Sequence, residues 1–252
     1  MIPRMIHYCW FGGKAKPNSV QRCINSWRKH LPDYQIVEWN EANFDLKHPR
    51  YVREAYESKK WAFVSDYARL FILYVNGGIY MDTDVEVCRS LDRFLDHRAF
   101  TGFEGPERIP TGIIGAERQH PWIGELLSEY EARPFILDGG IMDLTTNVTT
   151  ITNTALKRGL VVGGEYQVLD DDVRIYPVDW FCPLDYGTGK LKLTKNTHCI
   201  HHFHGSWVPL RDKFRRRGVI FLRNRFGENA VDFAVQCKRR IRSLIGGQDF
   251  SR

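Results

Sequence analysis

The chain has 252 residues, of which 43% are hydrophobic and 26% are charged, and its net charge at neutral pH is +6. These values are ordinary for a globular protein with a sizeable core. No apolar run approaches the roughly 20 residues that a membrane-spanning helix needs, and the N-terminus lacks the long apolar segment of a signal peptide. Twelve basic and four acidic residues follow His204, so the basicity is a C-terminal feature and does not mark the whole chain as a nucleic-acid binder.

The first part of the chain predicts alternating strands and helices. Residues 2–10 form a short apolar stretch, 18–30 carry apolar residues at helical spacing, and 34–39 form a second apolar stretch. A strand, a helix and a strand in this order are typical of a parallel α/β unit. Helices over 51–58 and 60–75 follow. The second of these is apolar nearly all the way round, which indicates a buried helix.

The same pattern continues along the chain. A Gly-Gly pair at 77–78 ends the apolar helix, and short apolar stretches indicate strands over 79–81, 99–103, 112–115, 173–177 and 198–202. Helices are predicted over 121–132 and 145–157. The predicted fold class is therefore α/β, with a sheet flanked by helices. We expect one domain over residues 1–210 and a basic helical extension over 211–252.

Asp82 and Asp84 follow the strand predicted over 79–81. Residues two apart in an extended chain point to the same side, so both carboxylates would lie together at the end of a buried strand. Close carboxylates repel each other unless a positive charge lies between them, and hard divalent cations prefer oxygen ligands. The pattern indicates a metal site that holds the diphosphate of a nucleotide-activated donor. A solvated turn is the other interpretation.

The buried helix before this pair carries two charges. Asp66 and Arg69 lie three residues apart and therefore share a helix face. Charges in a buried helix are costly unless they are paired, and an internal salt bridge accounts for both residues. The interpretation that we favour is that they bind hydroxyl or phosphate groups of a polar ligand beside the metal, because the aspartate pair follows so closely.

Two aromatic residues lie where a ligand could contact them. Tyr80 is two residues before Asp82 and faces the same side of the strand, and Trp10 ends the first predicted strand. An indole at a strand end can stack on a nucleobase, which contributes about 1–3 kcal/mol. Packing in the core explains each of these residues about as well.

A histidine cluster follows the last predicted strand, in the sequence HHFHGSW at 201–207. Imidazole is a common metal ligand. We therefore expect one of His201, His202 and His204 to complete the metal site, and we assign His202 and His204 to it. Ser206 and Trp207 would bind the phosphates from the other side.

The six cysteines are scattered and form no C-x-x-C pair. Disulfide frameworks are typical of shorter, secreted chains. We expect reduced thiols in the cytoplasm.

These residues resemble the glycosyltransferases that carry the DXD sugar-binding region, which include capsular polysaccharide transferases and the yeast initiating α-1,6-mannosyltransferase. More distantly, the chain is similar to the glucosyltransferase domains of the large glucosylating toxins. Three segments carry the match: IHYCWFGG at 6–13, SDYARLFILYVNGGIYMDTDV at 65–85 and HHFHGSW at 201–207. The resemblance implies a GT-A fold with a mixed sheet, a nucleotide-sugar donor, a Mn²⁺ or Mg²⁺ ion and retention of the anomeric configuration.

The resemblance also implies roles in donor binding. Trp10 would stack on the base, and Asp66 and Arg69 would hold the donor sugar. Tyr80 and Asp82 would meet the ribose and the sugar.

Metal and phosphate contacts follow from the same resemblance. Asp84 would bind the metal directly, and His202 lies in a pattern similar to the metal-binding H-x-x-G of glycogenin-type enzymes. Ser206 and Trp207 would contact the β-phosphate. The expected catalytic residues, which stabilise the charge that develops as the nucleoside diphosphate leaves, are Asp82, Asp84 and Arg69.

The sequence thus predicts a retaining, metal-dependent hexosyltransferase that uses a UDP-sugar in capsular polysaccharide, lipopolysaccharide or lipid-linked glycan synthesis. The acceptor would be a saccharide or a lipid-linked oligosaccharide, and no nucleic acid is expected as a partner. A nucleotide-sugar hydrolase and a non-catalytic glycan-binding module are the alternatives. For a mechanism with a carboxylate nucleophile, Glu104, Asp138 and Asp143 in the unmatched segment 104–148 all remain open.

The C-terminal extension is predicted to be helical and basic. Residues 229–245 place apolar residues on one helical face and most basic residues outside it. Basic amphipathic helices can lie on anionic membranes, whereas packing on the catalytic core is the other interpretation. The first interpretation predicts a cytoplasmic protein in peripheral contact with the inner face of the cell membrane.

Overall fold

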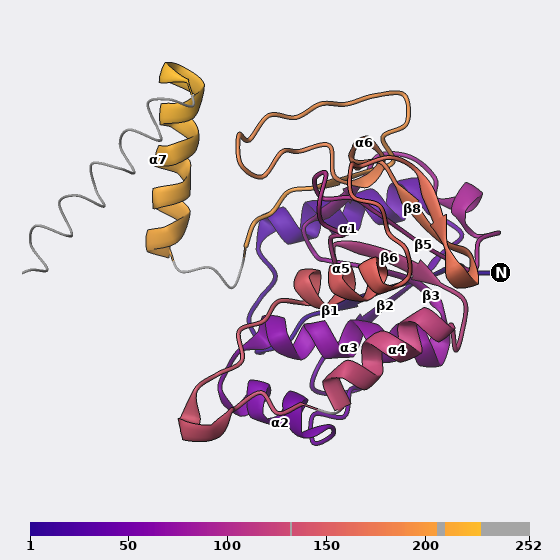
Figure 1. Cartoon of the computed structure of the whole chain (residues 1–252), viewed down its shortest axis with the longest axis vertical. Coiled ribbons are helices and arrows are strands. Elements are labelled where there is room, and N and C mark those ends of the chain that lie inside the picture. The colour runs from indigo at the N-terminus through magenta and orange to yellow at the C-terminus, as the bar shows by residue number, and fades with distance from the viewer. Residues whose placement is uncertain (132, 206–209, 228–252) are drawn as a thin grey trace, which may run out of the picture. The chain divides into compact units, whose positions relative to one another are not determined.

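The computed structural model describes residues 1–131, 133–205 and 210–227. Helices and strands are interspersed along the chain (Figure 1). The helices are α1 (Asn18–His30), α2 (Arg50–Glu57), α3 (Trp61–Asn76), α4 (Pro121–Glu131), α5 (Asn147–Lys157), α6 (Val178–Phe181) and α7 (Leu210–Phe226). The strands are β1 (Met5–Cys9), β2 (Gln35–Trp39), β3 (Gly78–Met81), β4 (Val85–Val87), β5 (Ala99–Gly102), β6 (Ile113–Ala116), β7 (Gln167–Leu169), β8 (Val173–Tyr176) and β9 (Cys199–His201).

Seven strands form one mixed sheet in the order β2-β1-β3-β6-β5-β8-β7. Strand β1 is parallel to β2 and β3, and β5 is parallel to β8. Strand β6 is antiparallel to β3 and β5, and β7 is antiparallel to β8. A separate two-stranded sheet pairs β4 with β9 in antiparallel orientation. The predicted fold class, α/β with a mixed sheet flanked by helices, is confirmed.

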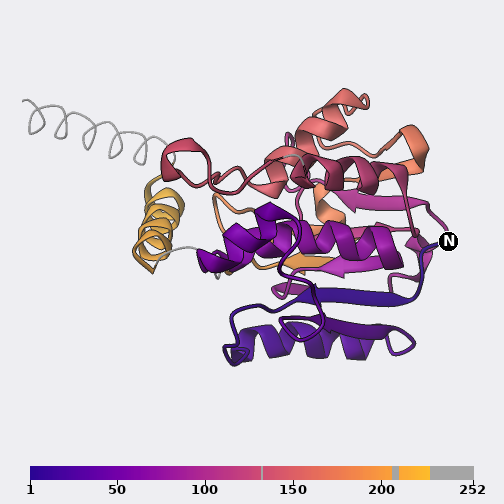
Figure 2. The same cartoon turned by 90° about the horizontal axis from the view of Figure 1, so that it is seen from below.

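Helices cover both faces of the large sheet (Figure 2). Tyr80 of β3 packs into the core cluster that contains α3 and α4, whereas its neighbours Ile79 and Met81 pack into the cluster that contains Trp27 of α1. Alternate residues of a strand point to opposite faces, so a strand covered on both faces is apolar throughout. This explains why β3 reads as an uninterrupted apolar run.

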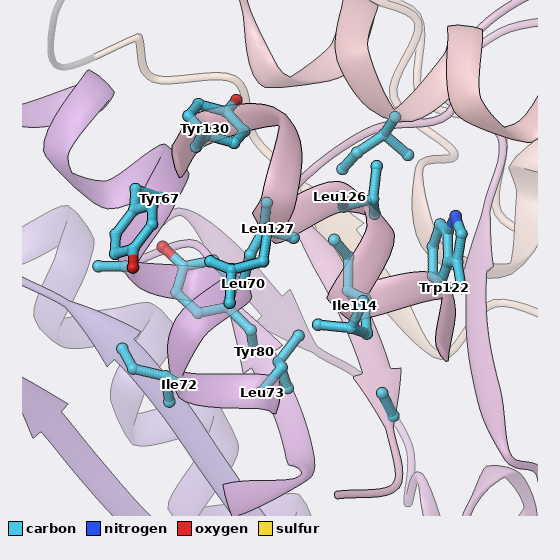
Figure 3. Packing of buried hydrophobic residues seen from close by; sticks show 14 of the residues in the cluster. Tyr67, Leu70, Ile72, Leu73, Tyr80, Ile114, Trp122, Leu126, Leu127 and Tyr130 are labelled. Atoms are coloured by element: carbon cyan, nitrogen blue, oxygen red, sulfur yellow. The ribbon is translucent and has the colours of Figure 1, made fainter. Parts of the chain in front are cut away.

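Helix α3 is apolar on most sides because it lies between the sheet and α4. Figure 3 shows Leu70 and Leu73 of α3 close to Ile114 of β6 and Leu127 of α4. Both leucines are fully buried, and burial of each contributes about 1.5–3 kcal/mol. The helix ends where Gly77 adopts a φ of 67°, a conformation that glycine adopts without strain.

The predicted elements agree with the structure to within three residues at each end. The sequence did not indicate β4, β7 or α6, which are all short. The helix expected over 229–245 lies outside the described residues. Among the described residues, no helix combines the length and the apolar character needed to cross a bilayer, and the five cysteines there are free thiols.

The chain divides into two compact units. The first comprises Met1–Asp185 and Leu191–His204 and contains both sheets. The second comprises Tyr186–Lys190 and Gly205–Arg252, and α7 is its main described element. Within this second unit, Arg223 donates a hydrogen bond to the carbonyl of Gly187 at 2.7 Å. The expected boundary between residues 210 and 211 stays a prediction.

Candidate functional site

Asp82 and Asp84 lie in the tight turn that links β3 to β4. The backbone N–H of Asp82 donates to the carbonyl of Gly112 at 2.9 Å, and the N–H of Val85 donates to the carbonyl of Asp82 at 3.0 Å. The turn, and not the alternation of an extended strand, therefore brings the two carboxylates together. Their side chains are 23% and 16% exposed, so they are shielded from bulk water but still accessible to a ligand.

His201 brings a third ligand atom to the two aspartates. It is the last residue of β9 and lies opposite Val85 of β4. Its Nε2 is 3.3 Å from Oδ1 of Asp84, and one ligand atom from each of Asp82, Asp84 and His201 lies within 4.8 Å of the others. The backbone N–H of His204 donates to Oδ2 of Asp84 at 2.7 Å. The small β4–β9 sheet thus fixes the position of the cluster.

Asp84 and His201 form a buried ion pair. Burial alone would raise the pKa of Asp84, but the hydrogen bond and the charge of His201 outweigh it and lower that pKa to about 2. Burial likewise disfavours a charged His201, yet the contact with Asp84 raises the pKa of His201 well above its usual value. A metal ion competes with the proton on His201, because metal ligands must be deprotonated.

Arg69 links the aspartate turn to the buried helix α3. Its Nη2 lies 3.2 Å from Oδ1 of Asp66 and 3.3 Å from Oδ1 of Asp82. Its Nε donates to the carbonyl of Ser65 and its Nη1 to the carbonyl of Thr111. All three guanidinium nitrogens therefore bind protein atoms, and Arg69 orients both carboxylates. Direct contact between Arg69 and a ligand stays a prediction.

Asp66 and Tyr80 complete the buried part of the site. Burial raises the pKa of Asp66 to about 6, against the opposing charge of Arg69. The hydroxyl of Tyr80 donates to Oδ1 of Asp82 at 3.0 Å, and the guanidinium of Arg69 lies 4.8 Å from the centre of the Tyr80 ring. Tyr80 is only 2% exposed. It is therefore a core residue that also contacts the site.

Trp10 lies one residue after β1 and is partly exposed. Its Nε1–H donates to the carbonyl of Lys14 at 2.6 Å, and Nζ of Lys16 lies 5.8 Å from its ring. The indole also packs against the core cluster on the α1 side of the sheet. Stacking of Trp10 on a base stays a prediction. Ser206 and Trp207 lie outside the described residues.

The histidines at the end of β9 have different partners. His201 faces Asp84, whereas Nε2 of His202 lies 2.8 Å from Oε2 of Glu86. The ring of His204 stacks on that of His202, with 5.5 Å between the ring centres. The structure thus places the imidazole of His201 beside the aspartates. The assignment of His202 and His204 to a metal stays a prediction.

Two further residues belong to this site. A Cβ at Gly112 would lie only 2.7 Å from Nδ1 of His201, so glycine is needed for the imidazole to approach this strand. The only hint of this role in the sequence was that Gly112 directly precedes an apolar stretch. Glu104 follows β5, and its pKa is raised by burial, with His201 and Asp82 as interacting charges. In the sequence, Glu104, Asp138 and Asp143 were equally good candidates for a nucleophile, and nothing there favoured Glu104.

The ligand atoms of this cluster fit a hard divalent cation. Carboxylate oxygens suit Mg²⁺ and Mn²⁺, and a single imidazole nitrogen is also a common ligand of first-row transition metals. Asp82, Asp84 and His201 would supply two carboxylates and one imidazole. Such a set suits Mn²⁺ and accommodates Mg²⁺.

The sequence match to a known family includes most of this site. Residues 17–101 match the family model described as "Glycosyltransferase sugar-binding region containing DXD motif". This segment contains α3 with Asp66 and Arg69, as well as Asp82 and Asp84. The predicted resemblance to the DXD-motif glycosyltransferases is confirmed over this segment.

Curated relatives carry names of the same class. The chain is 29% identical over 131 residues to "Inositol phosphoceramide mannosyltransferase 3" of Schizosaccharomyces pombe, a match that covers 48% of this chain and 35% of the relative. It is 25% identical over 222 residues to "Uncharacterized glycosyltransferase L373" of Acanthamoeba polyphaga mimivirus, which covers 83% of this chain and 85% of the relative. The chain thus spans about a third of the length of the yeast relative.

Solved structures of glycosyltransferases are similar at lower identity. PaToxG glycosyltransferase is 17% identical with a TM-score of 0.48, and the match covers 62% of this chain and 69% of that one. The galactosyltransferase LgtC is 15% identical with a TM-score of 0.44, and the match covers 86% of this chain and 94% of that one.

Proposed function

We propose that this chain, which carries the sugar-binding region of DXD-motif glycosyltransferases, is a retaining, metal-dependent hexosyltransferase. It moves a hexose from a UDP-sugar to a saccharide or lipid-linked oligosaccharide, in capsular polysaccharide, lipopolysaccharide or lipid-linked glycan synthesis. The observation that carries the proposal is the convergence of Asp82, Asp84 and His201 beside the buried Arg69. A solvated turn would not need a buried arginine or a histidine from a distant strand.

The residues of the site have distinct tasks in this proposal. Asp82, Asp84 and His201 hold a Mn²⁺ or Mg²⁺ ion, which supplies Lewis-acid stabilisation of the leaving diphosphate when it is bound. Arg69 keeps Asp66 and Asp82 oriented through contacts of 3.2 and 3.3 Å. Asp66 accepts hydrogen bonds from hydroxyl groups of the donor sugar. Since these groups are already held by the fold, little reorganisation accompanies the reaction.

Retention of configuration allows two routes. The acceptor hydroxyl attacks from the face that the leaving group vacates, or a carboxylate first forms a covalent glycosyl intermediate. Of the three acidic residues left open by the sequence, Asp138 is exposed and Asp143 pairs with Arg133 at 3.7 Å. Glu104 is partly buried, and its pKa is raised by burial and influenced by the charges of His201, Arg108 and Asp82. We therefore assign Glu104 as the nucleophile if the second route operates.

Titration calorimetry with UDP, in the presence and absence of Mn²⁺, tests the donor site. We expect UDP binding that requires the metal, and an Arg22→Gln variant on the exposed side of α1 should bind like the wild type. UDP binding of equal strength without a divalent metal would contradict the proposal. Relatives named as mannosyltransferases make GDP-mannose the competing donor, so thermal-shift screening should include it beside UDP-glucose, UDP-galactose and UDP-N-acetylglucosamine.

Two other functions would use parts of the same site. A nucleotide-sugar hydrolase would transfer the hexose to water, and product analysis with and without acceptor saccharides separates the two activities. A non-catalytic glycan-binding module gives no reason for Asp66, Arg69 and Asp82 to form a buried charge cluster. Hexose release that does not change when acceptors are added would favour the hydrolase.

We also propose peripheral membrane contact on the cytoplasmic face, through the C-terminal extension. Helix α7 exposes Phe214, Phe221 and Phe226 together with Arg215 and Arg225. Exposed aromatic and basic side chains on one helix are typical of surfaces that bind anionic lipid. Sedimentation with phosphatidylserine vesicles should pull down the full chain and not a chain that ends at Arg211. Equal vesicle binding by the full and the truncated chain would contradict membrane contact through this extension.

A further inference from the structure

Residues of α4, α5 and the segment between them line a polar groove. Both helices pack into the core cluster that contains α3, and Figure 1 labels all three helices. The volume of the groove is about 440 Å³, which is within the range of small-ligand sites. Hydroxyl, amide and cationic groups line it, and the main ones are Arg133, Thr149, Thr150, Asn153, Thr154 and Lys157. The groove is therefore lined by groups that can both donate and accept hydrogen bonds.

Arg133 contributes unused hydrogen-bonding capacity to this groove. Its Nε and Nη2 are buried and make no hydrogen bond with any described residue. The guanidinium lies over the ring of Tyr130, 4.4 Å from its centre, and 5.2 Å from the centre of the Tyr51 ring. A buried polar group without a partner costs about 1–3 kcal/mol. The Nε already faces Oδ2 of Asp143 at 3.7 Å, and a ligand with oxygen acceptors would satisfy the guanidinium once the side chain turns toward the groove.

Other unpartnered polar atoms are buried in the same part of the core. The hydroxyls of Tyr51 and Tyr130 and the Oδ1 of Asn147 are buried without a hydrogen bond to a described residue, and the three side chains are at most 2% exposed. Most buried polar atoms in folded proteins are satisfied. Tyr51 also interacts with Arg133, and of this buried cluster only Arg133 itself lines the groove.

This region adjoins the donor site. The Nδ2–H of Asn147 donates to the carbonyl of Asp66 at 2.9 Å, and Arg133 interacts electrostatically with the carboxylate of Asp66. Asn147 begins α5, and Thr149 and Thr150 of the groove follow it within one turn. A ligand in the groove would therefore lie next to the residue assigned to the donor sugar.

The charges of the groove favour a neutral ligand. Arg133 pairs with Asp143 at 3.7 Å, and Lys157 pairs with Glu129 at 4.0 Å. Because each cation is matched by a carboxylate, the groove has no excess positive charge for a phosphate. Hydroxyl groups of a sugar match its threonines and its asparagine, since both partners can donate and accept.

We propose that the groove between α4 and α5 binds the acceptor saccharide through its neutral hydroxyl groups. This inference rests on the proposed transferase function, because it places the acceptor beside the donor-sugar residue Asp66. Arg133 and the threonines of α5 hold the sugar ring, and Asn153 and Thr149 contact it from the rim.

Saturation-transfer NMR with the methyl glycosides of mannose, glucose and galactose tests this, in the presence of UDP and Mn²⁺. We expect at least one glycoside to bind, and Arg133→Gln to raise its Kd about tenfold or more. A Thr149→Val/Asn153→Ala double variant changes only exposed rim positions and should weaken the same glycoside. Ser128→Ala, an exposed position of α4 outside the groove, is the matched control.

Three results would overturn the inference. The first is that no glycoside binds the wild type, or that the rim variant binds it unchanged. The second is that inorganic phosphate binds the groove more tightly than the glycosides and is lost in Arg133→Gln. The third is that the rim variant weakens UDP-hexose but not UDP, which would make the groove a donor subsite. Failure of the wild type to bind UDP would defeat the proposed function instead, and the glycoside result would still decide the role of the groove.

Discussion

Gly112 lies so close to the ring of His201 that a Cβ on this glycine would be 2.7 Å from Nδ1 and 3.0 Å from Cε1. The carbonyl of the same glycine accepts the backbone N–H of Asp82. One residue before β6 therefore sets the positions of both an aspartate and the histidine. Its substitution should affect the metal site more than the fold.

We expect Gly112→Ala to displace the imidazole of His201 and to weaken Mn²⁺-dependent UDP binding by about 10–100-fold, the size of effect seen when a ligand loses its support. Titration calorimetry measures the loss. Gly105→Ala is the matched control, because a Cβ at Gly105 meets nothing within 4 Å. Unchanged metal dependence in Gly112→Ala would mean that His201 does not bind the ion.

Asp84→Asn should abolish hexose transfer and leave the fold intact. The amide cannot supply an anionic ligand, and the charge that holds His201 and accepts the N–H of His204 is lost. Turnover is measured by release of UDP, and circular dichroism reports on the fold. Asp33→Asn, at an exposed position, should behave like the wild type. Near-wild-type turnover in Asp84→Asn would contradict the proposed mechanism.

Glu104→Ala tests the covalent route. We expect kcat to fall by about a hundredfold or more, and added azide to restore turnover by forming a glycosyl azide in place of the missing carboxylate. Glu107→Ala, an exposed position in the same loop, is the control. A small effect on kcat and no glycosyl azide would favour attack from the face of the leaving group.

Buried histidines make the fold sensitive to acid. Burial lowers the pKa of His7 from 6.5 to about 4, although the hydrogen bond with the Gly77 carbonyl opposes this. Between these two pH values the unfolded chain binds the proton and the folded chain does not. The stability from a neutral His7 is therefore complete above pH 6.5 and is lost as the pH falls toward 4, at a cost of about 3 kcal/mol.

Other groups act on the same pH range. Burial also lowers the pKa values of His97, His120 and His198, which adds to the loss. Asp66 has the opposite sign, because burial raises its pKa to about 6 and the folded state then holds the extra proton. Glu104 and His201 also have raised pKa values and act with the same sign as Asp66. Urea denaturation at pH 7, 6 and 5 should show falling stability, with a steeper fall in Asp66→Asn. Rising stability toward pH 5 would contradict this account.

Local patterns in the sequence predict the scaffold of the site well. The long apolar run predicts α3, and the glycine pair after it predicts where α3 ends and β3 begins. Asp66 and Arg69 are thereby placed on a buried helix, because a helix that is apolar on nearly all sides is buried. Asp82 and Asp84 were also placed together, although a turn and not strand alternation is the cause.

Pairing between distant segments was not predictable in the same way. Nothing near Val85 or His201 in the sequence indicates that β4 and β9 are partners across 116 residues, so the choice among three histidines stayed open. The groove beside Arg133 was missed for a related reason. Its lining comes from α4, α5 and the segment between them, and these residues come together only in three dimensions.

The pairing of Val85 with His201 also has a consequence for biogenesis. During translation, the nascent chain presents both aspartates more than 110 residues before His201. Such long-range pairings form late because a large loop must close first. The proposed cation site therefore assembles only once β9 has paired with β4, and a ribosome-stalled fragment that stops before β9 would lack the His201 ligand.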